Sequence, residues 1–267
     1  MNDYIIFTDL DGTLLDHHDY SFAEAIPALK KIKEMQIPLI INSSKTFAEI
    51  KQIREKMHIN WAFSVENGAA IFLPDGKISG TDNAMEQIIL GIPYHKILNI
   101  LKSLREIDGF EFKGFNDFSV KGLMLETGLP EIEATQAKQR LASEPLLWLD
   151  GEDKLKMFEE KLNHQGLQLI QGGRFLHVMG KNDKSTAMAW LLNRFNLDSK
   201  TLVIALGDSQ NDLRMLEQAD YAAIIRKNNG ESLQISKSPE TIVKSKSIAP
   251  MGWQEAIDEL FKNLNIG

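Results

Sequence analysis

The stretch that decides the fold is Tyr4-Ile-Ile-Phe-Thr-Asp-Leu-Asp-Gly-Thr13, near the start of the chain. Its first half is a run of β-branched and aromatic residues, which is typical of a buried strand in a parallel sheet. Its second half places Asp9 and Asp11 directly after that strand. Two neighbouring carboxylates repel each other unless a cation bridges them or one holds a proton, and both states suit catalysis. The pattern indicates a catalytic loop, although a polar turn that caps the next helix also uses such residues.

Outward from this stretch, strands and helices alternate. Apolar residues spaced three and four apart across residues 21–35 predict an amphipathic helix. Strands are expected at residues 38–42, 62–65, 201–206 and 221–225, and further helices at 46–57, 184–195, 212–218 and 253–264. This alternation predicts an α/β fold with a doubly wound, Rossmann-like parallel sheet.

The middle of the chain has a different pattern. Helices are expected around residues 94–105 and 130–141, and short strands at 146–149, 167–170 and 175–178 look antiparallel. Such a segment is long enough to form a domain. We therefore expect residues 1–82 and 180–267 to form the α/β core, and residues 83–179 to be an inserted α+β cap.

Composition excludes several classes of protein. The 267 residues carry a formal net charge of −7 and contain no cysteine. Disulfides, thiolate metal sites and cysteine nucleophiles are therefore excluded, and a reducing compartment fits. A net negative chain is a poor general binder of nucleic acid or of a membrane surface. Since there is neither a secretory signal nor an apolar run of 18 residues, we expect a cytoplasmic protein.

Phosphate-suited residues follow the second predicted strand, in Ser43-Ser-Lys-Thr46. Small hydroxyls and a cation that open a helix suit an oxyanion. The alternative is that each serine only caps the helix.

Two further groups lie in the C-terminal part of the chain. Lys184 opens a predicted helix, where a lone lysine is either a phosphate ligand or a solvated surface charge. Asp208 and Asp212, with Asn211 between them, follow another predicted strand. Oxygen donors in this number favour a hard cation such as Mg²⁺, although a polar turn could also use them. A zinc site is not expected, because there is no cysteine and the histidines are scattered.

The order of these groups resembles the haloacid dehalogenase-like phosphatase superfamily. The matching motifs are Asp9-x-Asp11-x-Thr13, Ser43, Lys184 and Asp208-x-x-Asn211-Asp212. The resemblance implies that Asp9 is the nucleophile and Asp11 the general acid and base. It implies that Ser43 and Lys184 bind the phosphoryl group. It also implies that Mg²⁺ is held by Asp9, the backbone carbonyl of Asp11, Asp208 and Asp212.

Shorter matches look like the mannosyl-3-phosphoglycerate phosphatase subfamily. They are Ser43-Ser-Lys-Thr46, Glu66-Asn-Gly68, Thr127-Gly-Leu129, Arg140 with Glu144-Pro145, and Gly172-Gly-Arg-Phe175. The implied substrate is a small phosphorylated sugar-glycerate, with Ser44, Lys45, Arg174 and Glu66 as candidate substrate-binding residues. Arg174 could grip the glycerate carboxylate, or it could lie exposed on a hairpin turn. Glu66 could bind sugar hydroxyls, or it could only shape the end of a strand.

Other functions stay open at this point. The chain could be a phosphatase for sucrose-phosphate, trehalose-phosphate or a hexose phosphate, or a phosphomutase. It could also be a sugar-phosphate-binding module without activity, although the paired aspartates argue against this. We expect no nucleic-acid or membrane partner, and a monomer or homodimer.

Overall fold

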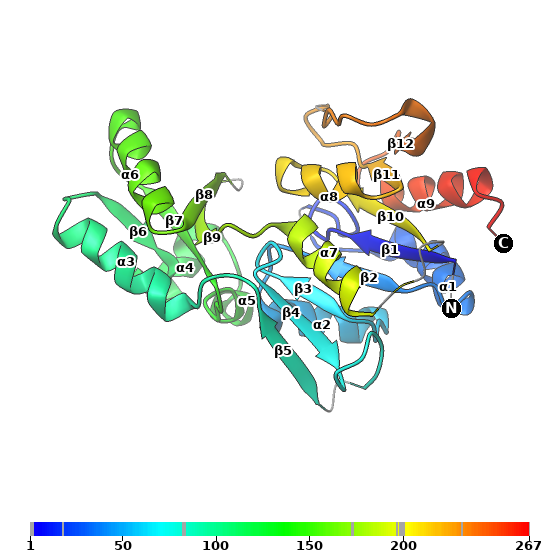
Figure 1. The fold of residues 1–267 in the computed structure, drawn as a ribbon, viewed down its shortest axis with the longest axis horizontal. Helices are drawn as coiled ribbons and strands as arrows, with labels where there is room; N and C mark the ends of the chain where they lie inside the picture. Colours follow the sequence, from blue (N-terminus) through cyan, green and yellow to red (C-terminus); the bar gives the residue numbers. More distant parts are fainter. Residues whose placement is uncertain are drawn as a thin grey trace.

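A large, mainly parallel sheet forms the core of the protein (Figure 1). The computed structural model describes residues 3–17, 19–81, 84–171, 174–195, 197, 201–230 and 232–266. In this part of the chain, eight strands pair in the order β12-β11-β10-β1-β2-β3-β4-β5. Their bounds are β1 Tyr4–Thr8, β2 Leu39–Asn42, β3 Phe63–Val65, β4 Ala70–Pro74, β5 Met85–Ile89, β10 Leu202–Gly207, β11 Tyr221–Ile224 and β12 Ile242–Lys244. Pairing is parallel from β12 to β3 and antiparallel from β3 to β5.

Helices cover both faces of this sheet, which confirms the doubly wound α/β prediction. Buried side chains of α1 (Ile26–Glu34), α2 (Phe47–Met57) and α9 (Met251–Asn263) share one apolar cluster with the sheet. Those of α7 (Lys184–Arg194) and α8 (Leu213–Gln218) belong to a second cluster. The central strand β1 alternates between them, with Ile6 in the first and Ile5 and Phe7 in the second. A strand buried on both faces needs such a continuous apolar run.

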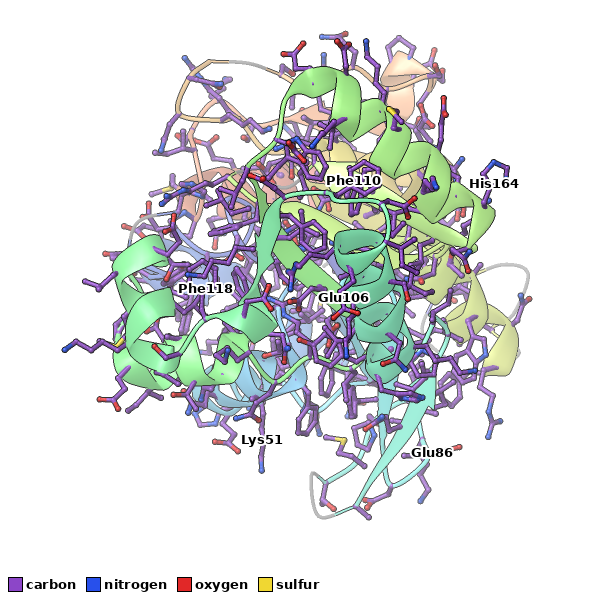
Figure 2. All side chains as sticks on the ribbon, turned by 90° about the vertical axis from the view of Figure 1, so that its left-hand side faces the viewer. Lys51, Glu86, Glu106, Phe110, Phe118 and His164 are labelled. Carbon is purple, nitrogen blue, oxygen red and sulfur yellow. The ribbon has the colours of Figure 1, made fainter. Side chains whose placement is uncertain are left out.

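The second sheet belongs to the inserted cap, seen on the left of Figure 1. It has the antiparallel order β6-β7-β9-β8 in the described residues. The bounds are β6 Phe112–Gly114, β7 Ser143–Trp148, β8 Leu167–Gln171 and β9 Leu176–Gly180, with helices α3 Tyr94–Glu106, α4 Val120–Thr127, α5 Glu131–Ala137 and α6 Glu152–His164. Figure 2 looks onto the cap and marks Phe110, which packs in one apolar cluster with α3 and α6.

The predicted start of the cap at residue 83 is corrected by β5. This strand, marked by Glu86 in Figure 2, pairs with β4 along Met85–Ile89 and therefore extends the core sheet. The sequence did not predict β5 because this edge strand is partly exposed to solvent and has no long apolar run. Residues 82 and 83 lie outside the described residues. None of the helices in the described part of the chain is long and apolar enough to cross a membrane.

Candidate active site

The chemistry-bearing residues of the core meet at one edge of the parallel sheet. They are Asp9 after β1, Ser43 after β2, Glu66 after β3 and Asp208 after β10. Ligands of such sheets bind outside the carboxyl ends of the strands. A cavity of about 520 Å³ opens there, lined by Asp9, Asp11 and Asp208 from the core and by Ile170, Gln171 and His177 from the cap. The cavity thus has one wall in each sheet.

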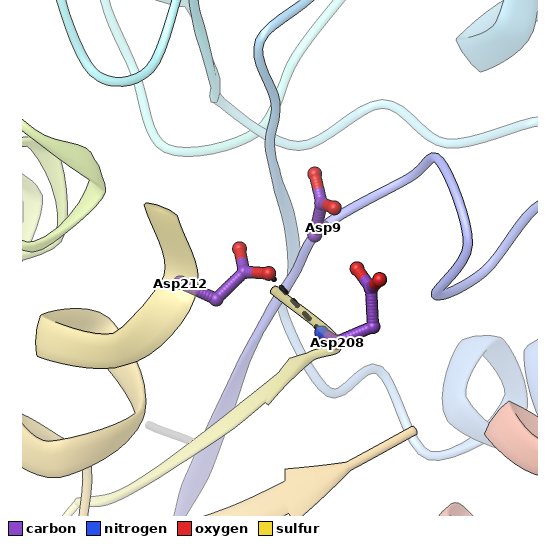
Figure 3. A group of neighbouring side chains, drawn as sticks. All are labelled: Asp9, Asp208 and Asp212. Carbon is purple, nitrogen blue, oxygen red and sulfur yellow. Dashed lines mark hydrogen bonds between the residues drawn. The ribbon is translucent and has the colours of Figure 1, made fainter. Parts of the chain in front are cut away.

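Three carboxylates converge beside this cavity (Figure 3). One oxygen of Asp9, one of Asp208 and one of Asp212 lie within 4.8 Å of one another. Oδ2 of Asp212 accepts the backbone N–H of Asp208 at 3.1 Å and that of Ser209 at 3.0 Å. A Cβ on Gly207 would lie 2.5 Å from the Asp212 Cβ, so only glycine lets Asp212 fold back onto the strand end. Asp212 is therefore held rigidly, while Asp9 and Asp208 face the cavity.

Lys184, the first residue of α7, reaches into this acidic cluster. Its Nζ lies 2.7 Å from Oδ1 of Asp9 and 2.6 Å from Oδ1 of Asp212. The lysine is completely buried. Burial alone would lower the pKa of Lys184, but the charges of Asp212 and Asp9 outweigh it and raise the pKa above its ordinary value. The alternative of a solvated surface lysine is therefore wrong.

The crowded carboxylates favour a bound cation. Burial raises the pKa of Asp9 well above its ordinary value, although Lys184 opposes the shift. Burial, then the charge of Asp212, raises the pKa of Asp208 to about 6. Three carboxylates face the ammonium groups of Lys184 and Lys227 here, so negative charge is in excess, and the donors are all oxygens. A hard divalent cation fits such a set, and Asp9, Asp208 and Asp212 each offer it a carboxylate oxygen.

Asp11 is not part of the group of three carboxylates, and its ion-pair partner is Lys45. Lys45 Nζ lies 3.0 Å from Oδ1 of Asp11, 3.9 Å from Oε1 of Glu49 and 4.4 Å from the centre of the Tyr20 ring. Its side chain is only 12% exposed. The structure thus brings Lys45 to Asp11, where it holds that carboxylate at the rim of the cavity. It does not place Lys45 on the cavity wall, as direct substrate binding would require.

The serines after β2 have separate positions. Ser43 is fully buried, and its Oγ accepts the backbone N–H of Lys45 at 3.2 Å. Ser44 lines the cavity. Neither serine is the N-cap of the helix, contrary to the alternative reading: the N-cap of α2 is Thr46, whose side chain pairs with Glu49 in a capping box.

Glu66 faces the cap backbone rather than the cavity. Its carboxylate is 1% exposed and accepts the N–H of Leu141 at 2.8 Å, the N–H of Ala142 at 3.1 Å and the hydroxyl of Ser143 at 2.6 Å. These donors occupy both oxygens. The carboxylate thus joins the core to the cap, and Glu66 is not among the described residues that line the cavity.

Arg174 lies outside the set of described residues that line the cavity. Its guanidinium, on a side chain that is 59% exposed, binds the carboxylate and the backbone carbonyl of Glu126 in α4. In this arrangement it does not reach the active site, contrary to the expectation that it grips a substrate carboxylate. Gly172 and Gly173, expected to offer backbone N–H groups, lie outside the described residues.

Four further cavity residues were not predicted from the sequence as site residues. Arg226 and Lys227 follow β11 and line the cavity, as do His17 and His177. Their position after a predicted strand was the signal that could have identified the two cations. Burial, helped by the charge of Arg140, lowers the pKa of His177 to about 3, so this cap residue is a neutral imidazole.

The sequence and the fold both match known proteins. Residues 6–246 match the haloacid dehalogenase-like hydrolase family. The chain belongs to this family. Among curated relatives of this haloacid dehalogenase-like hydrolase is a glucosyl-3-phosphoglycerate/mannosyl-3-phosphoglycerate phosphatase from Persephonella marina. It is 37% identical over 272 aligned residues, which cover 98% of this chain and 99% of the relative. A protein with the same description from Methanococcoides burtonii is 36% identical, with 98% and 99% coverage.

Solved structures show the same fold for this haloacid dehalogenase-like hydrolase. A protein from Thermoplasma acidophilum aligns with a TM-score of 0.68 at 15% identity, covering 99% of each chain. A haloacid dehalogenase-like hydrolase from Bacteroides thetaiotaomicron aligns with a TM-score of 0.67 at 19% identity, covering 97% of this chain and 99% of that one. The agreement over nearly the full length includes the cap as well as the core.

Proposed function

We propose that this hydrolase is a Mg²⁺-dependent phosphatase that cleaves the phosphate monoester of glucosyl-3-phosphoglycerate or mannosyl-3-phosphoglycerate. The observation that carries the reaction is the contact of Lys184 with Asp9 at the edge of the cavity, 2.7 Å between Nζ and Oδ1. The ammonium group holds the carboxylate that would attack and adds positive charge where the phosphoryl group would lie. Full-length similarity to the phosphatases of Persephonella marina and Methanococcoides burtonii supports the substrate.

The side chains suit an in-line displacement. Asp9 would form a new bond to phosphorus while the bond from phosphorus to the sugar-glycerate oxygen breaks. Asp11 would give its proton to the departing alkoxide, then take a proton from the water that attacks the aspartyl-phosphate and frees Asp9. Phosphoryl transfer needs positioning and charge neutralisation above all, and Lys184 and the serine segment after β2 offer both. Asp9, Asp208, Asp212 and the Asp11 carbonyl would hold Mg²⁺, which would lower the repulsion between Asp9 and an anionic phosphate.

Two further cations in the cavity, Arg226 and Lys227, suit the glycerate carboxylate. Arg226 and Lys227 line the cavity, and Lys227 Nζ lies 4.0 Å from Oδ2 of Asp208. Arg226 precedes Lys227 in the chain and donates from Nη1 to the backbone carbonyl of Lys246 at 3.2 Å. A guanidinium that keeps other donors available can pair with a carboxylate in a bidentate manner. We therefore assign the carboxylate to Arg226, in place of Arg174.

The cap would then contact the sugar. Ile170, Gln171 and His177 form its wall of the cavity. This gives the inserted module, from the end of β5 to the end of β9, the role of setting substrate specificity. We also propose a cytoplasmic location, which the absence of cysteine from the sequence supports. Either a monomer or a homodimer is compatible with a cavity built from one chain.

A phosphate-release screen tests the proposal. Glucosyl-3-phosphoglycerate, mannosyl-3-phosphoglycerate, 3-phosphoglycerate, sucrose-phosphate, trehalose-phosphate and hexose phosphates are incubated with enzyme and Mg²⁺, and inorganic phosphate is measured by colour. We expect the two glycosyl-phosphoglycerates to be hydrolysed fastest and chelation of Mg²⁺ to stop the reaction. If a plain sugar phosphate is hydrolysed fastest, the proposed substrate is wrong. If none of the compounds releases phosphate, the proposed phosphatase activity is wrong.

A further inference from the structure

The loop that follows β3 has an unusual backbone. Glu66, Asn67 and Gly68 have φ values of 51°, 55° and 82°, so three consecutive residues lie in the left-handed region. Residues with a side chain rarely adopt this conformation, and it persists where the surroundings hold it. A Cβ on Gly68 would lie 2.1 Å from the backbone oxygen of Asp183, so the loop is pressed against the segment that precedes Lys184.

The same loop holds the cap where the chain enters and leaves it. The carbonyl of Ala69 accepts the N–H of Leu90 at 2.8 Å and that of Gly91 at 3.0 Å, just after β5. The carbonyl of Asn67 accepts from Nδ2 of Asn182 at 3.5 Å, just after β9. Both covalent connections between core and cap therefore run over this loop.

Glu66 adds a third attachment that is not a chain connection. Its Oε1 accepts from Leu141, and its Oε2 accepts from Ala142 and from Ser143, the first residue of β7. Hydrogen bonds to a buried carboxylate are stronger than those between neutral groups. A third point of attachment beside two connections restricts rotation of the cap about the line that joins them.

The loop also contacts the catalytic residues. The N–H of Asn67 donates to the carbonyl of Ser43 at 2.9 Å, and its Oδ1 accepts from Nδ2 of Asn211 at 3.0 Å. Ser43 belongs to the segment after β2, and Asn211 lies beside Asp212. The loop that holds the cap is thus hydrogen-bonded to the Ser43 segment and to the loop that carries Asp212.

We propose that Glu66 is a positioning residue whose carboxylate sets the angle of the cap over Asp9. The inference rests on the proposed phosphatase function. Glu66 contacts neither Asp9 nor the cavity, so it acts through the cap wall of Ile170, Gln171 and His177. A substrate that fills the space between core and cap needs this wall in place, whereas a small phosphate ester needs only the core.

The test compares a large and a small substrate in Glu66→Gln. A glutamine side chain turns one acceptor into a donor, which would face the N–H of Leu141 or the N–H and hydroxyl donors of Ala142 and Ser143. We expect kcat/KM for the best glycosyl-phosphoglycerate to fall by at least roughly tenfold, since small misplacements of reacting groups are costly. The same ratio for p-nitrophenyl phosphate should change less than about twofold, because that substrate does not reach the cap wall.

Asp220→Asn is the control. Oδ2 of Asp220 accepts the backbone N–H of Val203 at 2.7 Å, near the start of β10, and the Asp220 N–H donates to the Val203 carbonyl at 2.8 Å. Both residues lie in the core and neither lines the cavity, so this variant should leave the ratio of the two substrates unchanged. Equal losses for both substrates in Glu66→Gln, or no loss for either, would overturn the proposal.

Ser143→Ala provides a milder variant. It removes one donor to Glu66 without leaving a buried donor unpaired, so it should fold even if Glu66→Gln does not, and it should shift the substrate ratio in the same direction by roughly two- to fivefold. An unchanged ratio in Ser143→Ala would count against the proposal. If the wild-type enzyme hydrolyses no glycosyl-phosphoglycerate, the proposed substrate fails, and the ratio is then measured with the largest sugar phosphate that the screen identifies.

Discussion

Lys184 and Asp9 form a buried ion pair, 2.7 Å between Nζ and Oδ1, which joins the start of α7 to the end of β1. The same ammonium group lies 2.6 Å from Oδ1 of Asp212. One cation thus faces two carboxylates, and burial raises the pKa of Asp9 even so. The residual negative charge explains why the site would take up a divalent cation, and the positive charge of that cation would then favour an anionic substrate.

Removing the Lys184 charge should destabilise the protein as well as inactivate it. In Lys184→Met the carboxylates of Asp9 and Asp212 lose their buried partner, which typically costs about 3–5 kcal/mol. Urea unfolding followed by circular dichroism measures this loss. The double variant Lys184→Met/Asp212→Asn should recover part of it, since one unpaired charge is removed. Equal stability of wild type and Lys184→Met would contradict the role given to the ion pair.

Mg²⁺ should stabilise the folded protein without any substrate. A ligand present at ten times its Kd contributes about 1.4 kcal/mol, which for a chain of this size raises Tm by a few degrees. Thermal unfolding with and without Mg²⁺ shows the shift, and chelation should reverse it. Asp208→Asn should abolish most of the shift because it removes a cavity-facing carboxylate. The same Mg²⁺-dependent rise in both proteins would place the cation elsewhere.

Glu144 gives the cap a pH-dependent stability. Burial raises the pKa of this carboxyl from its ordinary value of 4.5 to about 7, against the hydrogen bonds from the Asn116 N–H and the Tyr94 hydroxyl. The fold therefore prefers the protonated form. Its stabilising effect is complete below about pH 4.5 and is lost as the pH rises toward about 7, with a slope of up to roughly 1.4 kcal/mol per pH unit.

Glu144→Gln isolates this effect because glutamine stays neutral at every pH. The free energy of unfolding of wild type relative to the variant should fall between pH 5 and pH 7 and then level off. Parallel pH profiles for the two proteins would show that Glu144 does not titrate in this range.

Arg226 should distinguish substrates by their carboxylate. In Arg226→Ala, KM for a glycosyl-phosphoglycerate should rise by roughly 10- to 100-fold, since a charge-assisted pair contributes about 1.5–3 kcal/mol. KM for a hexose phosphate, which has no carboxylate, should change little. Arg174→Ala serves as the comparison, because the Arg174 guanidinium binds Glu126 instead. A selective effect of Arg174→Ala, with none from Arg226→Ala, would reverse the assignment.

The sequence was enough to predict that Asp9, Asp208 and Lys184 lie together at one edge of the sheet. Asp9 and Asp208 each follow a strand with a clear apolar pattern, and Lys184 begins a helix with one. A parallel sheet brings the carboxyl ends of its strands to one edge. The doubly wound core was predictable for the same reason. What places Asp208 beside Asp9 is the pairing of β1 with β10, a long-range contact that strand–helix alternation implies.

Contacts between core and cap could not be predicted. The donors to Glu66 come from Leu141, Ala142 and Ser143, whose sequence gives no sign that they approach the end of β3. Arg174 pairs with Glu126, and the apolar periodicity of the sequence does not predict this contact within the cap. Arg226 was not predicted as a site residue, although it directly follows a predicted strand and lines the cavity.

The most direct test of the central claim is the rate of phosphate release by Asp9→Asn. The asparagine keeps the size of the side chain but cannot form an aspartyl-phosphate, while Lys184 and Asp208 remain. With glucosyl-3-phosphoglycerate and Mg²⁺, and with folding checked by circular dichroism, we expect kcat to fall by at least roughly 10³-fold, as for other enzymes that lose their nucleophile. A folded Asp9→Asn enzyme within about tenfold of the wild-type kcat would contradict the account.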